Sequence, residues 1–215
     1  MAMGIYHSTN GVNFTRIKLP TGLQILSVFY SPAQGSVPAY WAAMGGDSVN
    51  YGGGAIFTSS NGVNWQSKVT VNSPYTFVSM ANNPTGETVA LSKQANWWLD
   101  SKVATTINGS AWTLTNFNYP ANEQYKLNSI VWSSVSSNWI VVGGHWFFDE
   151  IQWRYGNLGL QTTTPSNPLS YTQIPMLSNN NLNTGIESNS IVTNNSRLVS
   201  VATDGTIFYS SNGLN

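Results

Sequence analysis

A short hairpin motif recurs along the chain and constrains its fold more than any other feature. Its pattern is Ser-x-Asn-Gly-x-x-Trp/Phe, flanked by runs of apolar and β-branched residues. The motif residues of the four recognisable copies are Ser8, Asn10, Gly11 and Phe14; Ser59, Asn61, Gly62 and Trp65; Asn108, Gly109 and Trp112; and Ser210, Asn212 and Gly213. A degenerate copy is expected near Tyr155-Gly156-Asn157. The period is then about 50 residues, which is typical of propeller blades.

Each residue of the motif has a structural role. Asn-Gly between two strand-like runs indicates a β-hairpin, and a type I′ turn needs positive φ at both central residues, which Asn and Gly tolerate. The Ser two positions before the Asn can hydrogen-bond the loop backbone. The Trp or Phe after the turn can fill the space between neighbouring blades.

A second pattern, of two strand-like runs joined by turn residues, lies between successive copies of the motif. The paired runs are Ile25–Tyr30 with Tyr40–Gly46, Phe77–Met80 with Thr88–Leu91, Leu127–Trp132 with Trp139–Gly144, and Ile186–Val192 with Leu198–Val201. Each repeat thus holds four antiparallel strands, which is one propeller blade. No stretch shows sustained helical periodicity.

The sequence therefore predicts an all-β fold: a β-propeller of four-stranded antiparallel blades, with four or five blades. The blades are expected to form one repeat domain over residues 1–215, and the main competing fold is a β-sandwich or a row of small β modules. Both ends of the chain carry the same hairpin. Either the chain is a fragment of a longer array, or its ring is closed by an extra blade or by another subunit.

The hairpin resembles the Asp-box, or bacterial neuraminidase repeat, of sialidases and many other β-propellers. The family pattern is Ser/Thr-x-Asp-x-Gly-x-x-Trp, and residues 59–65 match it with Asn in place of Asp and one residue fewer. The shortened form is also similar to repeats of phage tail and bacterial surface proteins. The resemblance implies a propeller with the box between the third and fourth strands of a blade. It implies little about activity, because the box is structural.

Composition excludes several classes of partner. Charged residues make up 7% of the 215 residues, the formal net charge is zero, and the eight Lys and Arg are scattered singly, so no nucleic-acid partner is expected. Without Cys and with two His, no metal site is expected, and no cofactor either. No signal peptide and no apolar run long enough for a bilayer is visible. A virion or extracellular surface location is expected.

Enzymatic interpretations meet specific obstacles. The resemblance implies, for sialidase-like chemistry, an arginine triad with a Tyr-Glu pair and an acid Asp, but the only arginines are Arg16, Arg154 and Arg197. A glycosidase with paired carboxylates stays open, since two acids at a suitable separation suffice. Asp47 and Asp204 follow equivalent strands and form a conceivable pair; the alternative is that they are turn or loop residues.

Two segments that interrupt the repeat supply the candidate ligand-binding residues, which are Trp97, Trp98, His145, Trp146, Asp149, Glu150, Trp153 and Arg154. Aromatic rings beside carboxylates and Arg suit a sugar platform, but aromatics also pack between blades and form subunit contacts. We predict a non-enzymatic recognition or assembly module in a phage tail, virion or bacterial surface. Its expected partner is either a glycan, as for a lectin, or a neighbouring structural protein, and a homo-oligomer is compatible with the same surfaces. The alternatives are a glycoside hydrolase of sialidase-like type and a purely structural virion module.

Overall fold

The structure is a computed structural model, and it describes residues 4–19, 23–46, 53–72, 74–94, 101–117, 123–148, 153–167, 170–174, 187–194 and 196–211. Its strands are β1 (Ile5–His7), β2 (Thr15–Ile17), β3 (Gln24–Ser31), β4 (Tyr40–Gly46), β5 (Gly54–Ser59), β6 (Gln66–Val71), β7 (Tyr75–Asn82), β8 (Thr88–Gln94), β9 (Lys102–Thr106), β10 (Thr113–Asn116), β11 (Glu123–Ser133), β12 (Asn138–Phe148), β13 (Trp153–Thr162), β14 (Thr172–Gln173), β15 (Ser188–Thr193), β16 (Leu198–Ala202) and β17 (Ile207–Ser210).

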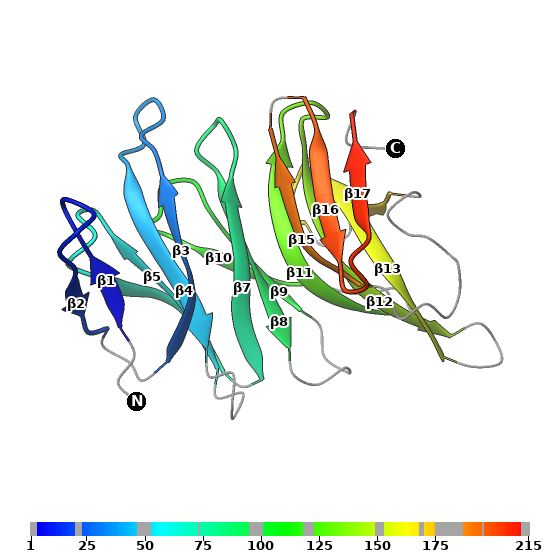
Figure 1. Ribbon diagram of the computed structural model, residues 1–215, viewed down its shortest axis with the longest axis horizontal. Helices are drawn as coiled ribbons and strands as arrows, with labels where there is room; N and C mark the ends of the chain where they lie inside the picture. The colour runs from blue at the N-terminus through cyan, green and yellow to red at the C-terminus, as the bar shows by residue number, and fades with distance from the viewer. Residues whose placement is uncertain are drawn as a thin grey trace.

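The strands form antiparallel sheets that follow one another in chain order (Figure 1). Three blades are four-stranded, in the orders β3-β4-β5-β6, β7-β8-β9-β10 and β11-β12-β13-β14. The fourth blade holds β15, β16 and β17 among the described residues, and β1 and β2 form a separate hairpin. This hairpin and β17 lie toward opposite ends of the long axis (Figure 1). The predicted fold class, an all-β propeller with four-stranded antiparallel blades, is confirmed.

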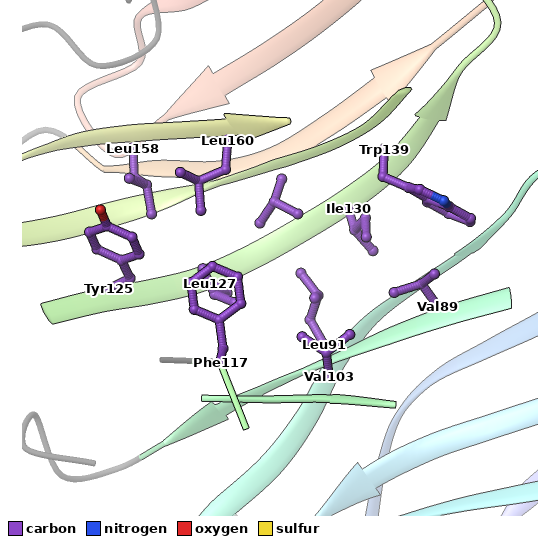
Figure 2. Packing of buried hydrophobic residues seen from close by; sticks show 11 residues of the cluster. Val89, Leu91, Val103, Phe117, Tyr125, Leu127, Ile130, Trp139, Leu158 and Leu160 are labelled. Atoms are coloured by element: carbon purple, nitrogen blue, oxygen red, sulfur yellow. The ribbon is translucent and has the colours of Figure 1, made fainter. Parts of the chain in front are cut away.

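The paired runs expected from the sequence are the first two strands of each blade, which explains why they are so apolar. In the second and third blades, the side chains of these strands pack on both faces, because each of these two blades lies between two neighbouring blades. A cluster between the second and third blades illustrates this packing (Figure 2), and its members are Val89, Leu91, Val103, Phe117, Tyr125, Leu127, Ile130, Trp139, Val141, Leu158 and Leu160. Burial of such side chains contributes about 25 cal/mol per Å² of apolar surface removed from water.

Each inner strand carries a β-bulge near its start and a serine just after it. The register shifts lie between Ile25 and Ser27, Phe77 and Ser79, Leu127 and Ser129, and Ser188 and Ser190. Two of these serines join neighbouring blades: the amide of Ile130 donates to Ser79 Oγ at 3.1 Å, and the amide of Ile191 donates to Ser129 Oγ at 3.4 Å. We call this contact the serine link.

The Asn-Gly turns differ from the predicted type I′. Only the glycine has positive φ, 72° at Gly62, while Ser137 is the only non-glycine residue with positive φ in the described part of the chain. Asn61 instead uses its side chain: Oδ1 accepts hydrogen bonds from the amides of Val63 and Asn64 at 3.0 and 2.9 Å. The prediction was wrong because an Asn that accepts two amides of its own turn needs no left-handed backbone.

The other roles assigned to the motif can be checked against its copies. Ser8 Oγ accepts from the amide of Gly11 at 2.8 Å, as expected for the loop bond. Trp65 and Trp112 each pack on a cluster shared with the preceding sheet, as predicted. Phe14, which belongs to the first hairpin, is 60% exposed.

The degenerate copy expected near Tyr155-Gly156-Asn157 is not a turn. These residues lie inside β13 and pair with Trp146, His145 and Gly144. In this blade the turn between the third and fourth strands instead follows Thr162. It lacks Asn-Gly and is held by other bonds, among them one from the amide of Thr164 to Thr162 Oγ1 at 3.0 Å.

Candidate functional site

The blades have two distinct rims. At one rim, which we call the strand-start rim, the inner strands begin and the second strands end, as the pairs Gln24 with Gly46 and Tyr75 with Gln94 record. The Asn-Gly turns lie at the opposite rim, because Ser59, which precedes one of them, pairs with Trp41 near the start of β4. Side chains of Ser59 and Asn61 hold one of these turns by local hydrogen bonds.

A buried carboxylate at the strand-start rim gathers polar side chains from the third blade. Glu187, just before β15, forms an ion pair with Lys126 Nζ at 2.7 Å. It also accepts hydrogen bonds from Asn128 Nδ2 and from the Tyr155 hydroxyl. The Glu187 side chain is 8% exposed and that of Lys126 is 26% exposed. We call Glu187, Lys126, Asn128 and Tyr155 the Glu187 cluster.

The backbone on both sides of Glu187 is fixed as well. Its amide donates to Thr203 Oγ1 at 3.2 Å, and the Thr203 amide donates to its carbonyl at 2.9 Å. The next amide, of Ser188, donates to Asn157 Oδ1 at 2.9 Å. Glycine at 144 makes room for the phenol, since a Cβ there would lie 2.2 Å from the Tyr155 hydroxyl oxygen.

The surroundings hold the cluster in a defined charge state. Burial alone would raise the pKa of Glu187, but hydrogen bonds from Lys126, Tyr155 and Asn128 hold it below its ordinary value. Burial and the adjacent carboxylate raise the pKa of Tyr155, so the phenol stays protonated. Burial, reinforced by the charge of Lys126, lowers the pKa of Lys93 on β8. At neutral pH, Glu187 is therefore an ionised carboxylate held by a phenol and an ammonium group.

A second polar group lies at the start of the same inner strand. The Tyr125 hydroxyl donates to Glu123 Oε2 at 2.5 Å and accepts from Gln173 Nε2 at 3.3 Å. The buried His145 meets the Tyr125 ring edge to face, with centroids 5.8 Å apart. Burial lowers the pKa of His145, and the negative charge of Glu123 offsets part of this shift. The imidazole is neutral at physiological pH.

The structure places only part of the predicted ligand set. Trp146 is half-buried at the strand-start rim, with its ring centroid 4.6 Å from that of Tyr155, which joins it to the Glu187 cluster. Arg154 lies beside Tyr155 in the sequence, on β13. Trp97, Trp98, Asp149 and Glu150 lie outside the described residues, as does the side chain of Trp153. The assignment of the whole set to a ligand stays a prediction.

None of the candidate ligand-binding residues predicted from the sequence belongs to the Glu187 cluster, and Tyr155 was expected in a hairpin turn. Lys126 and Glu187 are 61 positions apart, so only blade stacking brings them together. The available signal was composition: in a chain with 7% charged residues, charges beside consecutive inner strands are candidates for a shared site.

The arginines and the expected acid pair do not assemble. Arg16 is on β2, Arg154 on β13 and Arg197 just before β16, at the end of that strand away from the strand-start rim. The described arginines thus give no carboxylate-binding triad of the sialidase kind. Asp204 fits the turn interpretation, since it is exposed and accepts from the amide and hydroxyl of Thr206 at 2.9 and 2.7 Å. Asp47 lies outside the described residues.

Within the described ranges, no three His, Cys, Asp or Glu side chains come together as a metal site would require. The same residues contain no helix that is both long and apolar enough to cross a membrane. A virion or extracellular location stays a prediction.

Comparisons with known proteins identify similar solved structures. No protein family matches the chain, and no curated protein matches it. A β-1,2-mannobiose phosphorylase from Listeria innocua matches with a TM-score of 0.48 and 12% identity, over 94% of this chain and 64% of its own. A family 117 glycoside hydrolase from Zobellia galactanivorans matches with a TM-score of 0.48 and 9% identity, over 100% and 72%. An arabinanase from Bacillus subtilis matches with a TM-score of 0.44 and 11% identity, over 95% and 84%.

These three proteins are carbohydrate-active enzymes, which contradicts the prediction of a non-enzymatic recognition or assembly module in a phage tail, virion or bacterial surface. They agree better with its alternative, a glycoside hydrolase. The chain spans less than two thirds of the phosphorylase. With TM-scores below 0.5, these likenesses assign no activity, so a functional proposal has to rest on the residues of the strand-start rim.

Proposed function

We propose that the chain processes glycans, cleaving a glycosidic bond at the strand-start rim with Glu187 as the ionised carboxylate. The observation that carries this proposal is the Glu187 cluster. Glycosidases need one carboxylate that stays charged beside the sugar, where an oxocarbenium-like transition state develops positive charge. Ion pairing with Lys126 and the bond from Tyr155 hold Glu187 in this state.

The half-buried Trp146 supports a sugar as the ligand. An indole offers a flat apolar face to the C–H bonds of a pyranose ring, while neighbouring polar groups bond its hydroxyls. Trp146 contacts Tyr155, whose hydroxyl reaches Glu187, so aromatic surface and carboxylate are adjacent.

Hydrolysis also needs a protonated carboxyl group to donate a proton to the departing oxygen. Glu123 begins the inner strand that carries Lys126 and Asn128, but it accepts a hydrogen bond from Tyr125 and acts on His145 as a charged group, so it does not fit this role. The β12–β13 connection carries two more acids in its sequence, Asp149 and Glu150. Because the arginines do not form a triad, we propose a glycosidase without the sialidase carboxylate pocket.

The test is a screen for released reducing ends, on a panel of α- and β-linked polysaccharides and aryl glycosides. Glu187→Gln should lower kcat/KM on the responding substrate roughly 10²- to 10⁴-fold, the range for loss of a reacting acid or base. Glu87→Gln is the matched control, since Glu87 lies in the β7–β8 turn, bonded to Asn83 away from the strand-start rim. Lack of turnover across the panel, or wild-type activity in Glu187→Gln, would contradict the proposal.

We also propose that the hairpins are Asp-box elements in which Asn replaces Asp. In their support, Ser8 Oγ accepts from loop amides and Asn10 Oδ1 accepts from the amides of Val12 and Asn13, so both polar positions of the motif hold the turn. A carboxylate could accept the same amides. Asn10→Asp should therefore leave the turn intact, as hydrogen exchange of the Val12 and Asn13 amides would show.

A further inference from the structure

The inner strand of the first blade exposes a face that is buried in every later blade. In each inner strand, the residue after the bulge serine points toward the preceding blade. Met80, Ile130 and Ile191 hold this position in β7, β11 and β15, and all three are buried. The equivalent Val28 in β3 is 45% exposed.

Two aromatic residues extend the exposed face around Val28. Tyr30 lies two positions further along β3 and is 47% exposed, and its paired residue Trp41 on β4 is also exposed. The two rings contact each other, with centroids 4.6 Å apart. We call Val28, Tyr30 and Trp41 the head face.

The last blade exposes the complementary face. The second residue after each bulge serine points toward the following blade, and Phe29, Ala81 and Val131 pack there against buried clusters. The equivalent Val192 in β15 is 61% exposed. Val201 on the adjoining strand β16 is exposed as well. We call Val192 and Val201 the tail face.

The serine link adds polar complementarity to the two faces. Ser79 and Ser129 each accept the amide of the residue after the bulge serine in the next blade, which is Ile130 and Ile191. Ser190 holds the same position in β15 and is exposed. The amide that would match it is that of Val28, on the head face. The first blade and the last described blade therefore present the two halves of a contact that successive blades make internally.

We propose that the chain associates head to tail with a second copy of itself, the tail face of one copy packing on the head face of the next. A second copy is the occupant because it supplies both the apolar surface and the serine that a blade of this repeat supplies internally. None of the five residues of the two faces is charged, so no ionised group has to be buried. Such an interface is heterologous: it closes into a ring or extends as a filament, depending on the rotation.

In this assembly, β1 of one copy and β17 of the other would occupy the same strand position. Aligning the motif places Ile5-Tyr6-His7 of β1 on Ile207-Phe208-Tyr209 of β17, so both are third strands of a blade. Ile5 packs on Phe57 and already covers the outer part of the head side. The docking copy therefore contributes β15 and β16, and its β17 gives way to β1. The short β17, which pairs with β16 over four residues, fits this exchange.

The test measures mass by sedimentation across a range of protein concentrations. The wild-type chain should form dimers or larger species, and Tyr30→Lys and Val192→Lys should each be monomeric. A mixture of the two variants should form a one-to-one dimer and stop there, since it holds one intact head face and one intact tail face. Val135→Lys, which changes an exposed valine in the β11–β12 turn, is the matched control and should associate like the wild type.

Several results would overturn the inference. A wild-type chain that is monomeric at every concentration would leave the two faces to another partner. Failure of the mixed variants to pair, while the wild type still associates, would show an interface built from other surfaces. Ile207→Pro weakens β17 and should strengthen association by removing the competing strand; weaker association would refute the exchange. None of these readouts depends on glycan turnover, so they stand apart from the proposed activity.

Discussion

Replacing Asn61 with alanine tests whether the repeat motif stabilises the blades through its side chain. In the native turn, Asn61 Oδ1 accepts from two backbone amides and from the Ser59 hydroxyl at 3.0 Å. Alanine removes all three bonds and leaves the positive φ of Gly62 unchanged. The substitution therefore isolates the side-chain acceptor from the backbone conformation of the turn.

The expected loss follows from the number and exposure of these bonds. A protein hydrogen bond contributes about 0.5–1.5 kcal/mol net, and both amides belong to exposed residues to which water can bond instead. Two amide bonds at the lower half of that range give about 1–2 kcal/mol, similar to the loss of a helix N-cap. For a chain of this length, this corresponds to a fall in Tm of about 2–8 °C.

Thermal and urea unfolding, followed by tryptophan fluorescence, measure this loss. Asn61→Asp keeps an oxygen acceptor and should unfold close to the wild type. Asn10→Ala removes equivalent bonds from the first hairpin, whose Phe14 is largely exposed, and should cost global stability less. If Asn61→Ala unfolds at the wild-type midpoint, the turn is held by Gly62 and strand pairing alone, and the reasoning fails.

Three further predictions concern the strand-start rim and the blade contacts. Gly144→Ala should push the Tyr155 phenol away from Glu187. The free energy of unfolding measured by urea titration should fall by about 1–3 kcal/mol, and any glycan turnover should decrease. Full activity in this variant would refute the role given to the phenol. Burial lowers the pKa of His145 in the folded chain. As the pH falls below about 6.5, the imidazole therefore binds a proton more readily in the unfolded chain than in the folded one, and the free energy of unfolding should decrease. In His145→Gln, the urea midpoint should depend less on pH over this range. Trp112→Ala should cost roughly 2–4 kcal/mol, scaled from fully buried aromatics, and Phe14→Ala less than about 0.5 kcal/mol; equal losses in thermal melts would argue against packing by the Trp112 indole between blades.

Local patterns predicted the fold because each blade is built from short hairpins. The motif at Asn61-Gly62 and the paired runs such as Leu127–Trp132 mark turns and strands that fold through neighbours in sequence. The turn type was mispredicted because sequence does not reveal whether an Asn serves through its backbone or its side chain. Thr106 illustrates the same limit: its hydroxyl replaces the motif serine and accepts from the amide of Gly109 at 3.1 Å, although its residue type broke the pattern.

The Glu187 cluster could not be predicted from the sequence, because its contacts join residues of two neighbouring blades. Asn128 and Glu187 are 59 positions apart and sit in locally ordinary strand sequence. Nothing in a period of about 50 residues says which positions of successive repeats face each other. The candidate aromatics were easier to notice because they interrupt the repeat, and of these the structure brings Trp146 next to the cluster.

Because of the bulge in each inner strand, two consecutive residues can have different roles: one contacts groups at the strand-start rim, and the next bonds the backbone of the following blade. Asn128 and Ser129 are consecutive, yet both reach the fourth blade: Asn128 bonds the Glu187 side chain and the Ser188 carbonyl, while Ser129 receives the Ile191 amide. In the other inner strands the residue before the serine is Leu26, Val78 or Asn189. The serine can thus keep its bond to the next blade while the residue before it changes. Substitutions at the position before the serine can therefore alter the chemistry of the strand-start rim without weakening the serine link.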